Sequence, residues 1–243
     1  MALNTPINID NIKTRKSRIY KIGVELEGGW DETLPKGTQV IKDGSVTFPE
    51  MLVPPRYVGE LPSPPMDLIA MPTWVKKYYP QHVNNSCGLH VHLSFETPFL
   101  YQMLMCKEYP STVVAYVKKW AEEKGINKDN SIWPRLAGKS EFCQHIFNAD
   151  LQANSKRKEY DRHAVGHRYT VINYCWQRYN TLECRLLPMM ATATEAIEAI
   201  NELISITDKF LVATSNKKNA QANVKEEIEL DLTGNVEEIH EIL

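Results

Sequence analysis

Two histidines separated by a single residue, His90 and His92, are the first feature of this 243-residue chain that could do chemistry. They lie in the segment 87–94, which alternates polar and apolar residues. Because a β-strand sends alternate side chains to opposite faces of its sheet, both imidazoles are predicted to project together while the apolar residues beside them face a core. Paired imidazoles on a sheet surface suit a metal ion or a phosphate group.

Two further segments repeat this alternation with charged side chains. Glu25 and Glu27 are separated by one apolar residue, and so are Glu183 and Arg185. If the three segments are strands of one sheet, their polar side chains gather on one face. Buried charges must be paired or bound to a metal, so such a face is costly to build for stability alone. The pattern therefore predicts an active site.

The composition is that of an ordinary globular chain, with 43% hydrophobic and 24% charged residues. Its length suffices for one substantial core or two small ones. The formal net charge of −2 gives no overall basic field that would indicate a nucleic-acid or anionic-membrane partner. No apolar run approaches the roughly 20 residues of a membrane helix, no signal peptide is recognisable, and the five cysteines lack paired spacing. These features favour a cytoplasmic protein without a membrane partner.

The elements that must position the candidate residues predict an α+β domain over residues 19–214. It follows a flexible basic arm at residues 1–18 and precedes a polar linker and acidic tail at residues 215–243. The predicted strands cover residues 19–27, 87–94, 168–174 and 181–187. The predicted helices cover residues 66–79 (broken early by Pro72), 99–124 (interrupted at Pro110), 140–151 and 192–213. In the tail, a short strand at residues 228–232 is predicted before a turn at Gly234 and a small terminal helix.

Two loop segments carry further candidate residues. Asp43-Gly44-Ser45 favours a tight turn between strands. It is either that turn and nothing more, or a loop whose Asp43 and Ser45 contact substrate or nucleotide. Proline removes a hydrogen-bond donor and fixes φ, so the proline-rich segment 49–72 is predicted to be an ordered loop or a short edge strand.

Several nucleotide-binding and catalytic motifs are absent from the sequence. Trp133 stands where the first glycine of a phosphate-binding P-loop would lie, and there is no dinucleotide fingerprint, nucleophile elbow or Cys-x-x-Cys zinc pattern. A zinc hydrolase that uses His90, His92 and a nearby glutamate is an alternative. The basic arm and the basic residues 156–158 are the only features that point to nucleic acid, and a nucleic-acid partner is not expected.

Taken together, these short motifs resemble the amidoligase family, a branch of the glutamine-synthetase-like carboxylate–amine ligases. The resemblance covers about residues 20–213. Its motifs are Gly-Val-Glu-Leu-Glu (23–27), Asp-Gly-Ser (43–45), Gly-Glu-Leu-Pro-Ser-Pro-Pro (59–65), Ser-Cys-Gly-Leu-His-Val-His-Leu (86–93), Arg135 ahead of Phe-Cys (142–143), Arg168-Tyr169 with Asn173, and Thr-Leu-Glu-Cys-Arg-Leu (181–186). It implies a curved, mainly antiparallel sheet with helices on its convex face, and a site for ATP and Mg²⁺ or Mn²⁺ on its concave face.

The resemblance also implies a role for each motif residue. The expected metal ligands are Glu25, Glu27, Glu183 and His90. The expected nucleotide-binding residues are His90, His92, Ser45, Arg135 and Asn173. The expected catalytic residues are Arg168 and Arg185 as phosphate clamps, with Glu60 or Asp43 to take a proton from the incoming ammonium. Glu50 competes with Glu60 for the acidic motif position, and Glu60 is preferred because Ser-Pro-Pro follows it.

The implied activity is ATP-dependent formation of an amide bond through an acyl phosphate. Its partners would be a small-molecule or peptide carboxylate and an amine, neither of which the sequence identifies. The alternatives are the zinc hydrolase and a catalytically inactive binding protein of the same fold. The oligomeric state is open.

Overall fold

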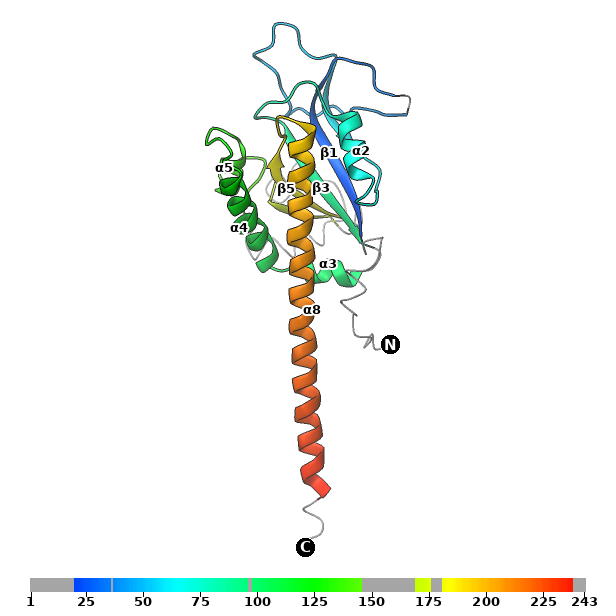
Figure 1. Ribbon diagram of the computed structural model, residues 1–243, viewed down its shortest axis with the longest axis vertical. Helices are drawn as coiled ribbons and strands as arrows, with labels where there is room; N and C mark the ends of the chain where they lie inside the picture. The colour runs from blue at the N-terminus through cyan, green and yellow to red at the C-terminus, as the bar shows by residue number, and fades with distance from the viewer. Residues whose placement is uncertain (1–19, 36, 96–97, 146–168, 176–180, 238–243) are drawn as a thin grey trace.

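The computed structural model describes residues 20–35, 37–95, 98–145, 169–175 and 181–237. They form an α+β fold around one open sheet of five antiparallel strands, as predicted (Figure 1). The strands are β1 (Tyr20–Trp30), β2 (Tyr57–Pro62), β3 (Gly88–Phe95), β4 (Ile172–Cys175) and β5 (Thr181–Pro188). Their order across the sheet is β2-β1-β3-β5-β4, so the three strands that carry the charged motifs lie next to one another.

The apolar positions of these strands line one face of the sheet and form the core. Val24 lies opposite Val91, and Leu26 lies opposite Leu89, in the antiparallel pairing of β1 with β3. All four side chains are at most 1% exposed. The predicted alternation of apolar and polar residues is therefore confirmed on both strands, and it leaves the opposite face of the sheet for the polar side chains.

β1 continues to Trp30, three residues beyond its predicted end, because its two glycines allow other segments to approach closely. Gly29 exchanges two backbone hydrogen bonds with His82, at 2.9 and 3.1 Å. A Cβ atom on Gly28 would lie 2.7 Å from Cγ of Pro80 and 2.8 Å from the carbonyl oxygen of His82. The glycine pair thus serves close packing within a strand rather than strand termination.

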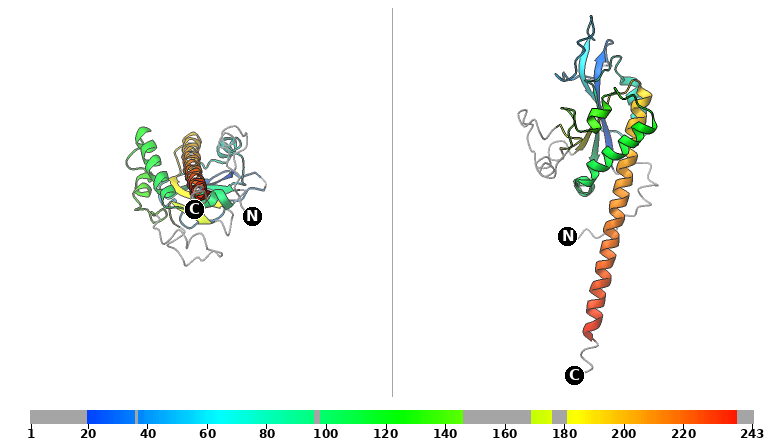
Figure 2. Two further views of the ribbon diagram at one scale, coloured as in Figure 1. Left: turned by 90° about the horizontal axis from the view of Figure 1, so that it is seen from below. Right: turned by 90° about the vertical axis from the view of Figure 1, so that its left-hand side faces the viewer.

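The helices are α2 (Met71–Tyr78), α3 (Pro98–Leu104), α4 (Glu108–Glu123), α5 (Ile132–Leu136) and α8 (Ala193–Glu237). Figure 2 shows α4 and α8 on the same side of the sheet. The two helices pack against each other, and the buried Tyr109 of α4 contacts α8 through a hydrogen bond with Thr207 and an edge contact with the ring of Phe210. This apolar layer closes the core over the sheet and holds the strands in place.

Neither Pro72 nor Pro110 breaks a helix at the predicted position. Pro72 is in the first turn of α2 and does not break the helix. The predicted helix 99–124 is two helices, α3 and α4, and Pro110 lies in the first turn of α4. A proline is tolerated in a first turn because its missing N–H would have no partner within the helix there.

Three other predicted elements differ from the structure. Residues 140–145 form a turn with isolated bridges instead of a helix, and the rest of the predicted helix 140–151 lies outside the described residues. The predicted strand 168–174 begins only at Ile172. The unpredicted helix α5 occupies a segment for which the sequence showed no clear period.

The predicted polar linker, the strand at residues 228–232 and the turn at Gly234 are wrong, because α8 continues without interruption to Glu237. Alanine, glutamine, lysine and glutamate are good helix formers, so the polarity of this segment is no evidence for a loop. The last part of α8 projects beyond the sheet and the other helices (Figure 1). The predicted arm at residues 1–18 and the small terminal helix lie outside the described part of the chain. Among the described helices, none combines the length and apolar character needed to span a membrane.

Candidate active site

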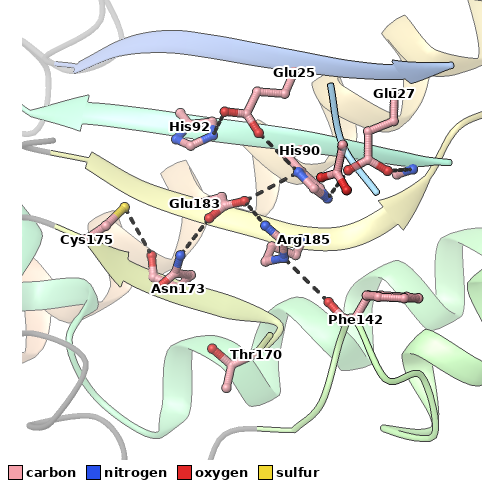
Figure 3. Close-up of polar contacts among 12 residues, drawn as sticks. Glu25, Glu27, His90, His92, Phe142, Thr170, Asn173, Cys175, Glu183 and Arg185 are labelled. Atoms are coloured by element: carbon pink, nitrogen blue, oxygen red, sulfur yellow. Dashed lines mark hydrogen bonds and ion pairs between the residues drawn. The ribbon is translucent and has the colours of Figure 1, made fainter. Parts of the chain in front are cut away.

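The polar side chains of β1, β3 and β5 converge on the face of the sheet opposite the core (Figure 3). Glu25 lies opposite His90 in the β1–β3 pairing, and His92 lies opposite Glu183 in the β3–β5 pairing. The Nδ1 atom of His90 is 3.2 Å from Oε2 of Glu25 and 3.4 Å from Oε1 of Glu183. The Nε2 atom of His92 is 3.1 Å from Oε1 of Glu25. The predicted convergence of the three motifs is therefore observed.

The pairing of β3 with β5 is irregular beside Arg185, which strand alternation from Glu183 already places on this face. Val91 lies opposite Cys184 and Leu89 opposite Leu187, so β5 carries one residue more than β3 between these two pairs. Cys184 and Leu187 consequently both face the core although they are three residues apart. The Arg185 guanidinium turns to the polar face and forms an ion pair with Glu183.

These residues border a cavity of about 1040 Å³. That is at the upper end of the roughly 300–1,000 Å³ typical of small-molecule sites. β2 and the segment Ile41–Ser45 form its other wall. Of the predicted site residues, the cavity is lined by Glu25, Asp43, Ser45, Glu60, His92, Asn173, Glu183 and Arg185.

Two groups of residues at the cavity or directly beside it have the spacing of metal ligands, and all of them except the buried Glu27 line the cavity. The first, here called the sheet cluster, consists of Glu25, His92 and Glu183. The second, here called the loop cluster, consists of Glu27, Asp43 and Glu60. Within each cluster, one ligand atom from each residue lies within 4.8 Å of the others. Carboxylates with at most one imidazole are a ligand set that suits Mg²⁺ or Mn²⁺.

The loop cluster places acidic side chains next to one another. Glu27 and Glu60 lie opposite each other in the pairing of β1 with β2. Like charges in such cross-strand pairs destabilise a sheet. Burial, together with the carboxylates of Glu25, Asp43, Glu27 and Glu183, raises the pKa of Glu60 to about 8. A bound divalent cation would remove this repulsion, so the residues fit the expected metal.

The sheet cluster holds its carboxylates in the ionised form. Burial alone would raise the pKa of Glu25, but His92 and His90 outweigh it and hold that pKa well below the ordinary value. Burial is likewise outweighed at Glu183, where Arg185 and both histidines lower the pKa. The two clusters therefore differ in how their negative charge is balanced by the protein.

His92 directs its Nε2 atom to the Glu25 carboxylate of the sheet cluster. Its Nε2 atom is buried and has no hydrogen-bond partner, although Oε1 of Glu25 lies at ion-pair distance. Its Nδ1 atom is 3.5 Å from the hydroxyl of Thr181. A histidine that binds a metal through one ring nitrogen usually has a hydrogen bond at the other, and His92 matches this arrangement.

His90 does not occupy the position expected of it. Its side chain is 3% exposed and it does not line the cavity. Its Nδ1 atom faces Glu25 and Glu183, and its Nε2 atom is 3.6 Å from Oε1 of Glu27. Of the two histidines, His92 belongs to the sheet cluster and His90 lies beneath it between three carboxylates, so the predicted ligand role of His90 has less support from the geometry.

Arg135 is also placed differently from its predicted role. It lies on α5, is 3% exposed and does not line the cavity. Its Nη1 atom donates to the carbonyl oxygens of Arg185 and Leu187, at 2.9 and 3.5 Å. Arg135 thus stabilises the irregular part of β5, and its burial away from the cavity gives its predicted contact with a nucleotide no support. Arg168 lies outside the described residues.

The choice between Glu50 and Glu60 is resolved by position. Glu60 lies on β2 and lines the cavity. Glu50 is exposed and accepts a hydrogen bond from Nδ2 of Asn84 at 3.0 Å. Glu60 is therefore the acid that belongs to the site.

Asp43-Gly44-Ser45 forms the predicted turn, and its contact with substrate or nucleotide stays a prediction. Oδ1 of Asp43 accepts hydrogen bonds from the amide and the hydroxyl of Ser45, each at 2.7 Å, as in a tight turn. The same turn lines the cavity. Asn173 completes the predicted set, because its Nδ2 atom donates to Oε2 of Glu183 at 2.7 Å and fixes that carboxylate.

Sequence reasoning missed two polar residues at the end of the cavity that β3 and β5 form. Ser94 and Thr181 lie opposite each other, and both line the cavity. Ser94 follows His92 by two positions, and Thr181 precedes Glu183 by two. Extending the strand alternation by one step in each direction would have identified them.

Comparison with protein-family models, with curated proteins and with solved structures gives no match. The class of the protein therefore rests on its own fold and site. It is an α+β protein whose open sheet, with the segment Ile41–Ser45, forms two acidic clusters, one of them with a histidine, at or directly beside a single cavity.

Proposed function

We propose that the protein is an ATP-dependent carboxylate–amine ligase that forms an amide bond through an acyl phosphate. The observation that carries this proposal is that two groups of side chains with the spacing of cation ligands, five of the six lining one cavity, lie near a fixed arginine. The clusters contain two and three carboxylates, five in total, and Arg185 pairs with only one of them. Such an excess of negative charge is expected where divalent cations and a polyphosphate bind together.

The reaction requires activation, because a carboxylate is a poor electrophile. In the proposed sequence, a carboxylate oxygen of the substrate attacks the γ-phosphorus of ATP, and the bond to the bridging oxygen breaks to release ADP. The amine nitrogen then attacks the acyl carbon, inorganic phosphate leaves, and the nitrogen loses a proton. Phosphoryl transfer needs positioning and charge neutralisation more than a protein nucleophile, and none is required here.

Each part of the cavity has a role in this scheme. Mg²⁺ or Mn²⁺ held by the two clusters would neutralise the phosphate oxygens. Arg185 would contact the transferring phosphoryl group, and its ion pair with Glu183 and its contact with the Phe142 carbonyl oxygen hold it in place. Asp43 or Glu60 would take the proton from the ammonium. We also propose that the sheet is curved, with the site on its concave face and the helices on its convex face.

The alternative of a zinc hydrolase receives less support from the geometry. Its proposed ligands were His90, His92 and a glutamate, but among the described residues His92 is the only imidazole in either cluster. Catalytic zinc is usually held by more than one nitrogen or sulfur ligand. A catalytically inactive binding protein of the same fold would have no need for so many buried charged side chains.

Trapping with hydroxylamine tests the proposal directly. The full chain is incubated with ATP, Mg²⁺, hydroxylamine and pooled carboxylates, and ADP release and hydroxamate masses are measured. Hydroxylamine opens an acyl phosphate whatever the natural amine is, so only the carboxylate has to be found. Glu183→Gln should reduce the rate roughly 100- to 1,000-fold, the range for removing one preorganised electrostatic group. Glu123→Gln, which changes an exposed glutamate on α4, is the matched control. Zinc-dependent hydrolysis of a substrate without release of ADP would contradict the proposal.

A further inference from the structure

Gly59 of β2 lies where the backbone of another segment passes too closely for any side chain. Its φ angle is +150°, which residues with a side chain rarely adopt. A Cβ atom there would overlap the carbonyl oxygen of Ile41, and would lie 2.9 Å from the Ile41 carbonyl carbon and 3.1 Å from the amide nitrogen of Asp43. All three are backbone atoms, so no flexible side chain could move aside.

The close approach allows the segment Ile41–Ser45 to pair with the outer edge of β2. The amide of Ile41 donates to the carbonyl oxygen of Glu60 at 2.8 Å, and the amide of Glu60 donates to that of Ile41 at 2.9 Å. Asp43 follows two residues later, and Ser45 fixes its carboxylate within the turn. The same bridge therefore places Glu60 and Asp43, two of the three residues of the loop cluster.

We propose that Gly59 is a positioning residue that docks the segment Ile41–Ser45 onto β2 and so assembles the loop cluster. The inference rests on the proposed function, because it assigns this cluster a cation. The sheet cluster needs no such docking, since its three residues lie on the paired strands β1, β3 and β5. Loss of docking should thus remove one cation site and leave the other.

The chain provides matched variants for this test. Gly59→Ala introduces a Cβ atom against the Ile41 backbone. Gly44→Ala changes a glycine in the same segment, where a Cβ atom would have nothing within 4 Å. Ile41→Pro removes the amide that donates to Glu60 and disrupts docking from the other side, so it decides the test if Gly59→Ala does not fold. Ile41→Ala keeps that amide, and the Ile41 side chain is 46% exposed, so this variant is its control.

The experiment measures docking and its consequence separately in the full chain. Hydrogen exchange reports docking: the amides of residue 41 and Glu60 should be protected in the wild type and in both controls. Both amides should be exposed in Gly59→Ala, and in Ile41→Pro, which has no amide at position 41, the Glu60 amide should be exposed. Titration with Mn²⁺ alone reports the consequence. The wild type and controls should bind two ions. The two docking variants should bind one ion normally and the other roughly 10- to 100-fold more weakly, the usual cost of disturbing groups that orient a ligand.

Two results would overturn the inference. Unprotected Ile41 and Glu60 amides in the wild type would show that the segment is not docked. Two normal Mn²⁺ sites in Gly59→Ala and Ile41→Pro, or equal loss of both sites in folded variants, would show that docking does not build the loop cluster. Protected amides in a wild type that binds no Mn²⁺ would instead contradict the cation sites of the proposed function, and with them the role of docking in cation binding.

Discussion

The two clusters at the cavity are built in different ways. The sheet cluster takes all its residues from the paired central strands, and Arg185, His90 and Asn173 balance or fix its carboxylates. The loop cluster combines two glutamates that oppose each other on β1 and β2 with an aspartate from an irregular segment. No described arginine or lysine pairs with its carboxylates. The protein itself balances the charge of the first cluster, whereas the carboxylates of the second repel each other unless Glu60 is protonated or a cation binds.

The largest effect is expected from neutralising the centre of the sheet cluster. Glu183→Ala removes the partner of the buried Arg185 and should destabilise the fold by about 3–5 kcal/mol, as for other broken buried ion pairs. ATP turnover should be lost. Thermal unfolding and ADP release measure the two effects. Unchanged stability and unchanged ATP turnover would show that Glu183 has neither role.

Arg185→Lys should keep the charge but impair the chemistry. Lysine has no planar fork and cannot match phosphate oxygens in a bidentate contact. The maximal rate should fall by at least tenfold, with a smaller change in stability than Glu183→Ala produces. Steady-state kinetics measure the change in rate, and unfolding curves measure the change in stability. A variant with the wild-type rate would show that Arg185 only balances Glu183.

Asp43→Asn should separate the clusters most cleanly. It changes a partly exposed loop residue, so the free energy of unfolding should shift by no more than about 0.5 kcal/mol. One of the two Mn²⁺ sites should weaken roughly 10- to 100-fold. If the stability falls as far as in Glu183→Ala, the distinction between a core cluster and a loop cluster is wrong.

Stability should respond to pH with opposite sign in the two clusters. The pKa of Glu60 is about 8 in the folded chain and near 4.5 when unfolded, so the unfolded state binds fewer protons between these values and stability falls as pH rises through that window. Glu25 and Glu183 have lowered pKa values, so their contribution is present above pH 4.5 and is lost as pH falls through their folded values. Without metal, Glu60→Gln should therefore reduce the loss of stability between pH 5 and pH 8. Thermal unfolding over this range measures it, and an unchanged slope would contradict the assignment.

Strand alternation was sufficient to predict which residues share a face. Glu25, His92 and Glu183 were found because a two-residue period is a local property of each strand. The same rule could not separate His90 from His92, which have equal parity. Their difference arises from the carboxylates of neighbouring strands, which enclose both ring nitrogens of His90, whereas His92 pairs with Glu25 at the border of the cavity.

Features that depend on tertiary contacts were beyond sequence reasoning. The extra residue in β5 appears only when its pairing with β3 is known, and it explains why Arg135 is needed behind Arg185. The docking of Ile41 on β2 is not encoded in any periodic pattern. The polar composition of residues 215–223 predicts a linker, but their helix propensity favours the continuation of α8 that the structure shows.

Calorimetric titration of ATP into the full chain, with and without Mg²⁺, is the most direct test of the account. The account predicts one saturable ATP site per chain that requires Mg²⁺, is lost in Glu25→Gln, and is retained in Glu123→Gln. Tight zinc binding together with no detectable ATP binding would contradict it.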